Sequence, residues 1–467
     1  MADIEDIYRL SPLQAGMLFQ ALYEGGGQAY ISQARFTLSG ELSPAVLRAA
    51  FDAAVLRHPV MRSAIVWKEL PEPVQTVLRT CTMPWQEHDW RDGDPRDAEA
   101  RLEAFCLADR KHGFVLERPP LMRAHLIRLA EERFAFIWTW HHILLDGWSV
   151  AQLLPELIGS YQAVANGGAA VPIARRPYRD YIAWLRQQQL ASAKAYWTRR
   201  LAGFTTPTPC PIAQADGEDA LFRQIELDAT ETARLVTAAR SRHLTPSTVA
   251  QACWAFLLSR MTGRDDVTFG GVVSGRPPSL ADAERMLGLF INTLPVRVRV
   301  PSSGRVDEWL DELQQEQVRA CEFEYTPLAE IRRWTSMVSG GLLFDSIVVF
   351  ENFPAPRHDI RHGGETRLRI EAHEGVSYTG FPLTVSIGLD ERLRIRLSVR
   401  NAGARTEEEL LRLGGQLLAL FRAVLVRRTD TIDDLHAAWD RAAAMEADQE
   451  RARRAAARRR IIHRYGS

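Results

Sequence analysis

The sequence predicts an α/β (α+β) fold, because helical and strand patterns alternate in both halves of the chain. The chain has 467 residues, enough for two or three domains or for two lobes that share one interface. Apolar residues make up 46% and charged residues 25%, the composition of an ordinary globular protein. These observations favour two folded lobes, each with helices packed against strands.

The first helices are predicted by Ser-Pro pairs. Ser11 and Ser43 can each cap a helix whose first residue is a proline. Behind Ser43 the apolar residues recur at helical spacing: Val46, Leu47, Ala50, Phe51, Ala54 and Val55. Residues 60–80 then suggest two short strands, and residues 97–106 suggest another helix.

Residues 122–129 and 133–142 alternate like strands. In the second of these, Trp140 and His142 share one parity, whereas His141 has the other. The two adjacent histidines therefore point to opposite faces if the strand continues that far. Ser149 is expected to cap the next helix, whose apolar stripe runs from Val150 to Val164.

A proline-containing break at residues 168–178 predicts the end of the first lobe, which we place at residues 1–175. The second lobe, residues 176–440, is expected to hold helices at 178–202, 231–242, 246–262 and from Thr406, with strands ending near 276 and 350 and a hairpin at 382–400. Residues 441–467 are predicted to form a solvated helical linker or tail.

The composition excludes some classes of function. Lys+Arg and Asp+Glu both number 58, so the zero net charge does not favour nucleic acid or an anionic membrane as a partner. Neither a signal peptide nor an apolar run of membrane-spanning length is visible. The five scattered cysteines form no CxxC pair, which argues against a zinc site or a disulfide framework. We expect a cytoplasmic protein with mostly buried cysteines that acts on a small substrate or a protein carrier.

The candidate site is the stretch from Trp140 to Ser149, between a strand and a helix, where α/β folds commonly place their chemistry. Adjacent histidines on a strand cannot hold one metal ion from the same face, and no helical His-x3-His spacing exists, so no metal is expected. A catalytic triad is disfavoured because no Gly-x-Ser-x-Gly elbow accompanies the histidines. The site therefore suits direct transfer, in which a histidine base helps a substrate amine or hydroxyl to attack an activated acyl group.

The neighbours of the histidines allow more than one role. Asp146 could orient a histidine, or it could pair with an arginine and fix the loop. Gly147 would let substrate approach the backbone and offer its N–H group. The alternative is that both histidines are merely structural residues near a turn.

Several stretches follow one another in an order that is specific to one family. Residues 141–149 (HHILLDGWS) match HHxxxDG, and residues 57–63 (RHPVMRS) match RHxxLRT with Met for Leu and Ser for Thr. The others are residues 11–19 (SPLQAGMLF), 178–184 (YRDYIAW), 273–277 (VSGRP), 288–297 (GLFINTLPVR) and 350–354 (FENFP). Together they resemble the condensation domains of nonribosomal peptide synthetases over roughly residues 5–435.

The resemblance implies two chloramphenicol-acetyltransferase-like lobes in a V with a tunnel at their interface. It implies a monomeric acyltransferase that forms amide bonds from substrates carried on the phosphopantetheine of carrier proteins, beside an adenylation domain, with no cofactor of its own. His142 would be the catalytic histidine, as a base or as a group that positions the amine. Asp146 would pair with an arginine, for which Arg276 is the first candidate and Arg62 the second. Gly147 would act through its backbone, and the site would be supported by three neighbours: His141, Trp148 and Ser149.

The subtype stays open. Epimerisation domains share HHxxxDG but carry an EGHGRE-like stretch, which residues 371–378 (EAHEGVSY) match poorly, and the cyclisation motif DxxxxD is absent. Residues 16–19, 325–331 and 350–354 resemble domains that accept a D-configured donor, and also some starter domains that take a fatty acyl-CoA. A start at Met1 leans towards a starter domain. A non-catalytic module that only binds carrier proteins is the remaining alternative.

Overall fold

A computed structural model describes residues 3–23, 30–169, 173–212, 221–335, 342–351, 359–362, 365–377, 379–400, 402–403, 405–425, 430–441 and 443–444. The chain divides into two compact units. Unit 1 comprises Met1–Leu190, Ser274–Asn292 and Phe353–Gly380, and unit 2 comprises Ala191–Val273, Thr293–Asn352 and Phe381–Ser467. The predicted tail at 441–467 lies, except for residues 441, 443 and 444, outside the described residues.

This division differs from the predicted boundary at residue 175, for two physical reasons. Helix α5 (Arg179–Leu185) belongs to unit 1, where Tyr178 and Tyr181 pack with Phe290 in an apolar cluster. Two segments from the second half of the chain also return to unit 1, so neither unit is one continuous stretch. A proline-rich break marks a loop, but it does not show with which unit the following helix packs.

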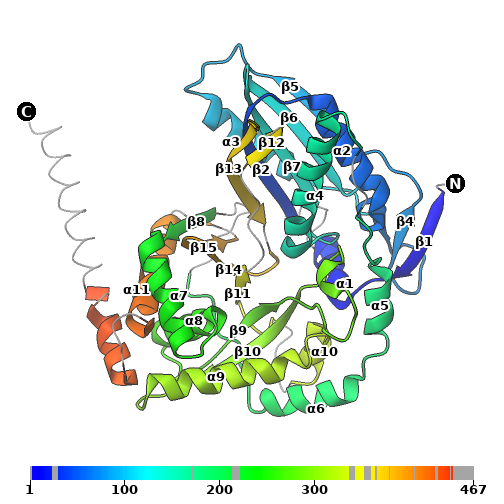
Figure 1. Cartoon of the computed structure of the whole chain (residues 1–467). Helices are drawn as coiled ribbons and strands as arrows, with labels where there is room; N and C mark the ends of the chain where they lie inside the picture. Colours follow the sequence, from blue (N-terminus) through cyan, green and yellow to red (C-terminus); the bar gives the residue numbers. More distant parts are fainter. Residues whose placement is uncertain are drawn as a thin grey trace, which may run out of the picture. The chain divides into compact units, whose positions relative to one another are not determined.

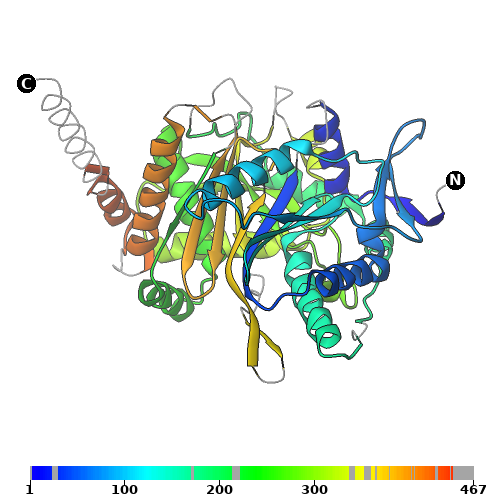
Figure 2. The same ribbon diagram turned by 90° about the horizontal axis from the view of Figure 1, so that it is seen from above.

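Unit 1 is built on a six-stranded sheet in the order β12-β13-β2-β7-β6-β5 (Figure 1). The strands are β2 (Ile31–Gly40), β5 (Trp85–Asp89), β6 (Met122–Ala130), β7 (Arg133–His141), β12 (Asp359–His362) and β13 (Glu365–Ser377). Strands β6 and β7 confirm the predicted pair. Strand β13 pairs with β2 from Leu368 to Ser377 and with β12 from Glu365 to Arg369, so the β12–β13 hairpin runs past the end of β2 (Figure 2).

Both faces of this sheet are covered, which explains why β7 is buried along almost its whole length. Aromatic side chains Phe136, Trp138 and Trp140 face a core shared with helices α2 (Pro44–Arg57) and α4 (Gly147–Ala165). The alternate residues Ala135 and Ile137 face α3 (Ala98–His112). The remaining elements are α1 (Pro12–Tyr23), the 3-10 helices η1 (Pro59–Arg62) and η2 (Ala283–Arg285), and a small sheet of β1 (Ile4–Arg9), β4 (Val74–Leu78) and β3 (Ser63–Val66).

The helices begin close to the predicted residues, but the predicted side chain does not always form the capping hydrogen bond. Ser11 Oγ accepts a hydrogen bond from Gln14 N (3.2 Å), as a capping serine should. Ser43 occupies the N-cap of α2 without a side-chain cap bond. The prediction for Ser149 was wrong, because Asp146 caps α4 and accepts from Ser149 N (2.8 Å).

Unit 2 contains a second six-stranded sheet in the order β10-β9-β11-β14-β15-β8. Its strands are β8 (Leu221–Glu226), β9 (Asp266–Val273), β10 (Asn292–Arg299), β11 (Ser346–Glu351), β14 (Leu383–Leu389) and β15 (Leu393–Val399). Its helices are α6 (Leu190–Arg200), α7 (Ala229–Ser241), α8 (Pro246–Thr262), α9 (Val306–Cys321), α10 (Leu328–Arg333) and α11 (Thr406–Leu425). Strands β14 and β15 confirm the predicted hairpin.

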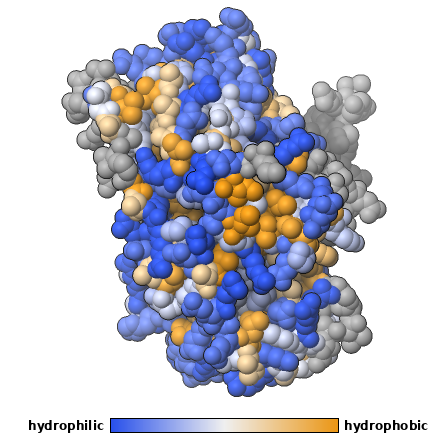
Figure 3. Space-filling view, turned by 90° about the vertical axis from the view of Figure 1, so that its right-hand side faces the viewer, coloured by the Kyte–Doolittle hydropathy of each residue, from blue (hydrophilic) through white to orange (hydrophobic). Residues whose placement is uncertain are grey.

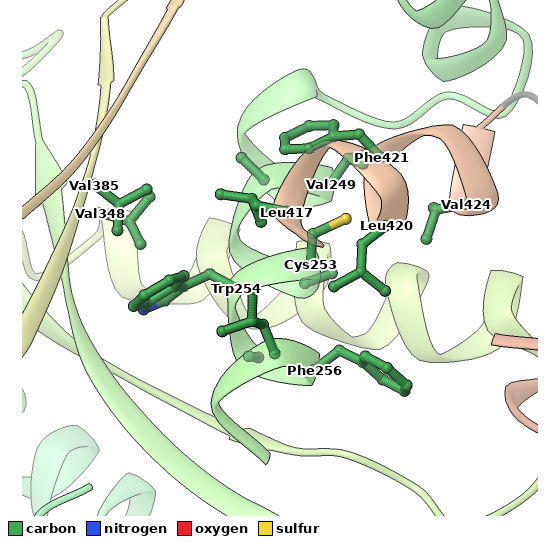
Figure 4. Packing of buried hydrophobic residues seen from close by; sticks show 14 of the residues in the cluster. Val249, Cys253, Trp254, Phe256, Val348, Val385, Leu417, Leu420, Phe421 and Val424 are labelled. Atoms are coloured by element: carbon green, nitrogen blue, oxygen red, sulfur yellow. The ribbon is translucent and has the colours of Figure 1, made fainter. Parts of the chain in front are cut away.

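Helix α8 is the centre of the unit 2 core, since every residue from Thr248 to Leu258 is buried. Trp254 points toward Val348 and Val385 of the sheet, while Cys253 lies among side chains of α11 such as Leu420 (Figure 4). Burial raises the pKa of the Cys253 thiol, so this cysteine behaves as a small apolar residue. Cys321 is instead exposed, so the expectation that the cysteines lie mostly in cores holds fully only for Cys106 and Cys253.

Within the described residues, no helix is both long and apolar enough to cross a membrane.

Candidate active site

The histidine pair lies where β7 ends and the turn to α4 begins. His141 is the last residue of β7 and is fully buried, and its Nδ1 accepts from Ile143 N (3.2 Å). The N–H of His142 donates to Tyr30 O (2.8 Å), which continues the pairing of β7 with the neighbouring chain segment by one residue. His141 therefore holds its own turn, and His142 follows immediately after the fixed strand.

The His142 side chain is kept neutral by its surroundings. Its Nδ1 is buried and, in the described part of the chain, has no hydrogen-bond partner outside its own residue. Burial lowers the pKa of His142 below its usual 6.5, more than its own main-chain carbonyl and the charge of Asp146 raise it. A neutral imidazole has a free lone pair at neutral pH, which is the form that can accept a proton.

Asp146 is saturated by groups other than the histidines. Its Oδ1 accepts from Ser149 N (2.8 Å) and Arg276 Nη2 (3.0 Å), and its Oδ2 accepts from Arg276 Nη1 (2.8 Å) and Phe290 N (3.0 Å). Four bonds use the acceptor capacity of a carboxylate, so Asp146 fixes the turn and does not orient a histidine as a triad aspartate does. Burial raises the pKa of this carboxyl, but Arg276 outweighs that effect and the pKa is lowered overall.

Arg276 is the partner that the structure gives to Asp146. Its side chain is only 3% exposed, forms a bidentate ion pair with the carboxylate and donates to Ser149 Oγ (3.0 Å). It also lies over the ring of Phe290, 4.3 Å from the ring centroid.

Arg62, the second candidate, does not contact Asp146. Its Nε donates to Val55 O (3.0 Å), and its Nη1 pairs with Glu5 Oε2 (2.7 Å) and bonds to Leu78 O and to Arg79 O (3.1 Å). Arg62 therefore joins η1 to the end of β4 and to β1, and none of these partners belongs to the histidine turn.

Segment 288–290, which belongs to unit 1 although it lies in the second half of the chain, is hydrogen-bonded to the start of α4. Ser149 Oγ donates to Gly288 O (2.8 Å) and accepts from Gly288 N (3.0 Å), while Asp146 N donates to the same carbonyl (3.1 Å). A Cβ at Gly288 would lie 2.1 Å from the ring of Tyr178, whose hydroxyl donates to Leu289 O (2.5 Å). Glycine is thus required at 288 by close approach.

Gly275 is required for a related reason. Its φ is +61°, and a Cβ there would lie 1.8 Å from Phe290 O. Residues of three motifs, namely Tyr178, Gly275 with Arg276, and segment 288–290, therefore come together near the first turn of α4. Trp148 contributes by donating from Nε1 to Glu284 O (2.9 Å), a packing role, and Gly147 is the first residue of α4.

In the motif at 57–63, Arg57 and His58 bind a carboxylate of α4 and do not contact the histidine turn. They bind Glu156 of α4, with Arg57 Nη1 at 2.5 Å and His58 Nε2 at 2.8 Å, and Arg175 binds its other oxygen at 3.2 Å. Burial raises the pKa of Glu156, but these three partners lower it to about 2 overall. This buried cluster ties α2 to α4 and is structural.

Ser149 was expected as a helix cap and, from the resemblance, as a supporting neighbour of the site; its hydroxyl joins Arg276 to Gly288. The sequence reasoning missed two glutamines. Gln14 and Gln75 are both fully buried: Gln14 donates to the main chain just after His142, and Gln75 accepts from Gln14, while only Gln14 lies in a recognisable motif. As for metals, no group of three His, Cys, Asp or Glu side chains able to hold an ion occurs among the described residues.

Comparison with known proteins places this geometry in a family. The family model described as "Condensation domain" matches residues 4–440. One polypeptide of the linear gramicidin synthase of Brevibacillus parabrevis is 37% identical over 425 residues, which is 89% of this chain and 5% of that protein. Bacitracin synthase 3 of Bacillus licheniformis is 32% identical over 442 residues, covering 93% of this chain and 7% of that protein. The chain thus spans less than a tenth of the length of these relatives.

Solved structures show the same fold. The first condensation domain of the calcium-dependent antibiotic synthetase aligns with a TM-score of 0.77 at 19% identity, over 92% of this chain and 98% of that one. A starter condensation domain of rhizomide synthetase, solved with C8-CoA, aligns with a TM-score of 0.75 at 20% identity, over 91% and 96%. The predicted α/β, chloramphenicol-acetyltransferase-like fold class is confirmed. The chain belongs to the condensation-domain family of nonribosomal peptide synthetases.

Proposed function

We propose that this domain forms an amide bond between two carrier-bound substrates, with His142 as the group that handles the proton. The observation that carries the proposal is a neutral, half-buried histidine on a turn that Asp146 and Arg276 fix, with no serine or cysteine nucleophile bonded to it among the described residues. Such a site favours direct attack of one substrate on the other.

The reaction balances without a cofactor. The acceptor amine nitrogen attacks the carbonyl carbon of the donor thioester, so a C–N bond forms and the C–S bond breaks. His142 accepts the proton that the amine loses, through its Nε2, and returns it to the departing thiolate. Burial supports this role because it keeps the imidazole unprotonated near pH 7. Asp146 and Arg276 hold the histidine turn, and Ser149 and Trp148 hold the segment packed against it. Gly147, without a side chain, would let the substrate approach its backbone.

The test combines an acceptor carrier loaded with an aminoacyl group and a panel of donors, with mass spectrometry of the products. The donors are L-aminoacyl and D-aminoacyl carriers and fatty acyl-CoA, which separates the D-donor subtype from the starter subtype. We expect an amide product and no deuterium exchange at the donor α-carbon. Exchange without an amide would instead assign an epimerase, and loss of both activities with intact carrier binding would assign a carrier-binding module.

We further propose that the exposed face of α1 docks one of the carrier proteins. Phe19, Leu22 and Tyr23 are 73%, 48% and 84% exposed, and the rings of Phe19 and Tyr23 stack with centroids 6.4 Å apart. Clustered exposed apolar side chains typically mark an interaction surface. Figure 3 shows apolar side chains gathered in a patch near the middle of one face of the molecule.

Replacing Phe19 and Tyr23 by serine is expected to raise the KM for one carrier-bound substrate about tenfold, since aromatic anchors dominate binding at interfaces. Rates with small soluble thioesters should stay unchanged, because these substrates need no docking. Leu56→Ser is the matched control, as Leu56 of α2 is 60% exposed but stands apart from this group. An equal loss with the soluble thioester would show that α1 acts on the chemistry and not on docking.

A further inference from the structure

The main chain just after His142 is held by a buried amide relay. Gln14 Nε2 donates to Ile143 O (2.9 Å), the carbonyl of the residue that follows His142. The same nitrogen donates to Gln75 Oε1 (2.8 Å), and Gln14 Oε1 accepts from Ser11 N (2.9 Å). Gln14 and Gln75 are both fully buried, so water cannot replace any of these partners.

Gln75 is the third partner of the Gln14 amide, whose orientation is set by the main-chain groups Ser11 N and Ile143 O. Its own Nε2 donates to Tyr8 OH (2.8 Å) and Ser63 Oγ (2.9 Å), which turns its oxygen toward Gln14. With the opposite orientation two NH2 groups would face each other, and a buried donor would lose its acceptor. Gln75 in β4 therefore supports, through Gln14, the turn that carries His142.

We propose that Gln75 is a positioning residue for His142. It lies outside every motif of the resemblance and contacts neither histidine; it acts through Gln14 and the Ile143 carbonyl. Removal of its amide leaves one Gln14 N–H without an acceptor. The unpaired buried N–H weakens the hold of the Gln14 amide on Ile143 O, and with it the position of the turn. The inference rests on the proposed function of His142 for its consequence in catalysis.

The experiment compares Gln75→Met, Gln14→Met, the double variant and Gln75→Glu in the full chain. A displacement of a catalytic group by a fraction of an ångström costs about tenfold in rate, so we expect each Met variant to lower the single-turnover rate about tenfold with KM unchanged. The double variant should lose about tenfold as well, because both changes break one relay. Gln75→Glu, whose fully buried carboxyl is expected to be protonated, keeps an acceptor for Gln14 and a donor for Ser63 Oγ, and it should recover most of the rate.

A second readout does not depend on turnover. The His142 ring titration, followed by NMR with labelled histidine, is expected to shift in Gln75→Met and Gln14→Met but not in Ile127→Val. Ile127 is a fully buried residue on the other face of the large sheet, so its variant controls for a general loss of stability.

An unshifted His142 titration in Gln75→Met would overturn the inference, and so would a hundredfold loss in the double variant, since additive effects mean independent residues. If the wild-type protein forms no amide with any donor, the proposed function fails, while the titration still decides the role of Gln75.

Discussion

Replacement of His142 by alanine is expected to slow amide formation by about 10²- to 10⁴-fold, the usual contribution of a general acid–base group. The reason is that the His142 imidazole is the only proton acceptor that we assign at the turn, and the Asp146 carboxylate is already saturated by four hydrogen bonds. The measurement is the single-turnover rate with loaded carriers, together with a urea unfolding curve that shows whether the variant stays folded.

His112→Ala serves as the control, because His112 is an exposed histidine at the end of α3. Its rate should match that of the wild type. Full turnover by folded His142→Ala would remove His142 from the chemistry and favour a structural role for both histidines.

Replacement of Asp146 by alanine is expected to lower the free energy of unfolding by about 3–5 kcal/mol, the usual effect of removing one partner of a buried ion pair. The Arg276 side chain is 3% exposed and would keep its charge without a counter-ion, and Phe290 N and Ser149 N would lose their acceptor. Urea unfolding at pH 7 measures the loss. The double variant Asp146→Leu/Arg276→Met is expected to lose less than Asp146→Ala alone, since no uncompensated charge remains.

The free energy of unfolding, measured by urea at several pH values, should depend on pH in a direction that the pKa of Asp146 determines. The pKa of Asp146 is lower in the folded protein than its usual 3.8, so its stabilisation is complete above that value and is lost as the pH falls through the folded pKa. As the pH falls into the acid range, the free energy of unfolding of the wild type should therefore decrease more steeply with pH than that of Asp146→Ala. A variant within 1 kcal/mol of the wild type at pH 7, or parallel curves in acid, would contradict this account of the pair.

The place of the histidines in the fold could be predicted because it follows from short-range rules. The predicted strand at 133–142 corresponds to β7, which ends at His141, so His142 begins the turn. The choice between Arg276 and Arg62 could not be made in this way. Arg276 lies 130 residues beyond Asp146, so the pairing depends on how segment 274–292 returns to unit 1.

The larger organisation could not be predicted for the same reason. Strand β13 completes the sheet of unit 1 although it lies near residue 370, and consecutive patterns alone assign that stretch to the second lobe. The requirement for glycine at 275 and 288 also became clear only from the atoms of Phe290 and Tyr178 that occupy the space of a Cβ. Gln75 carries no sequence signal, because a buried amide in a strand is recognised only through its partners.

The central claim is that His142 works in its neutral form, and one measurement tests it most directly. This is the ratio of the single-turnover rate constants of the wild type and His142→Ala as a function of pH, in which titration of the acceptor amine cancels. Because burial lowers the pKa of His142, we predict a constant ratio from about pH 8 to its usual pKa of 6.5 and a fall only below that value. A ratio that falls already above pH 6.5, or that grows as the histidine becomes protonated, would contradict the account.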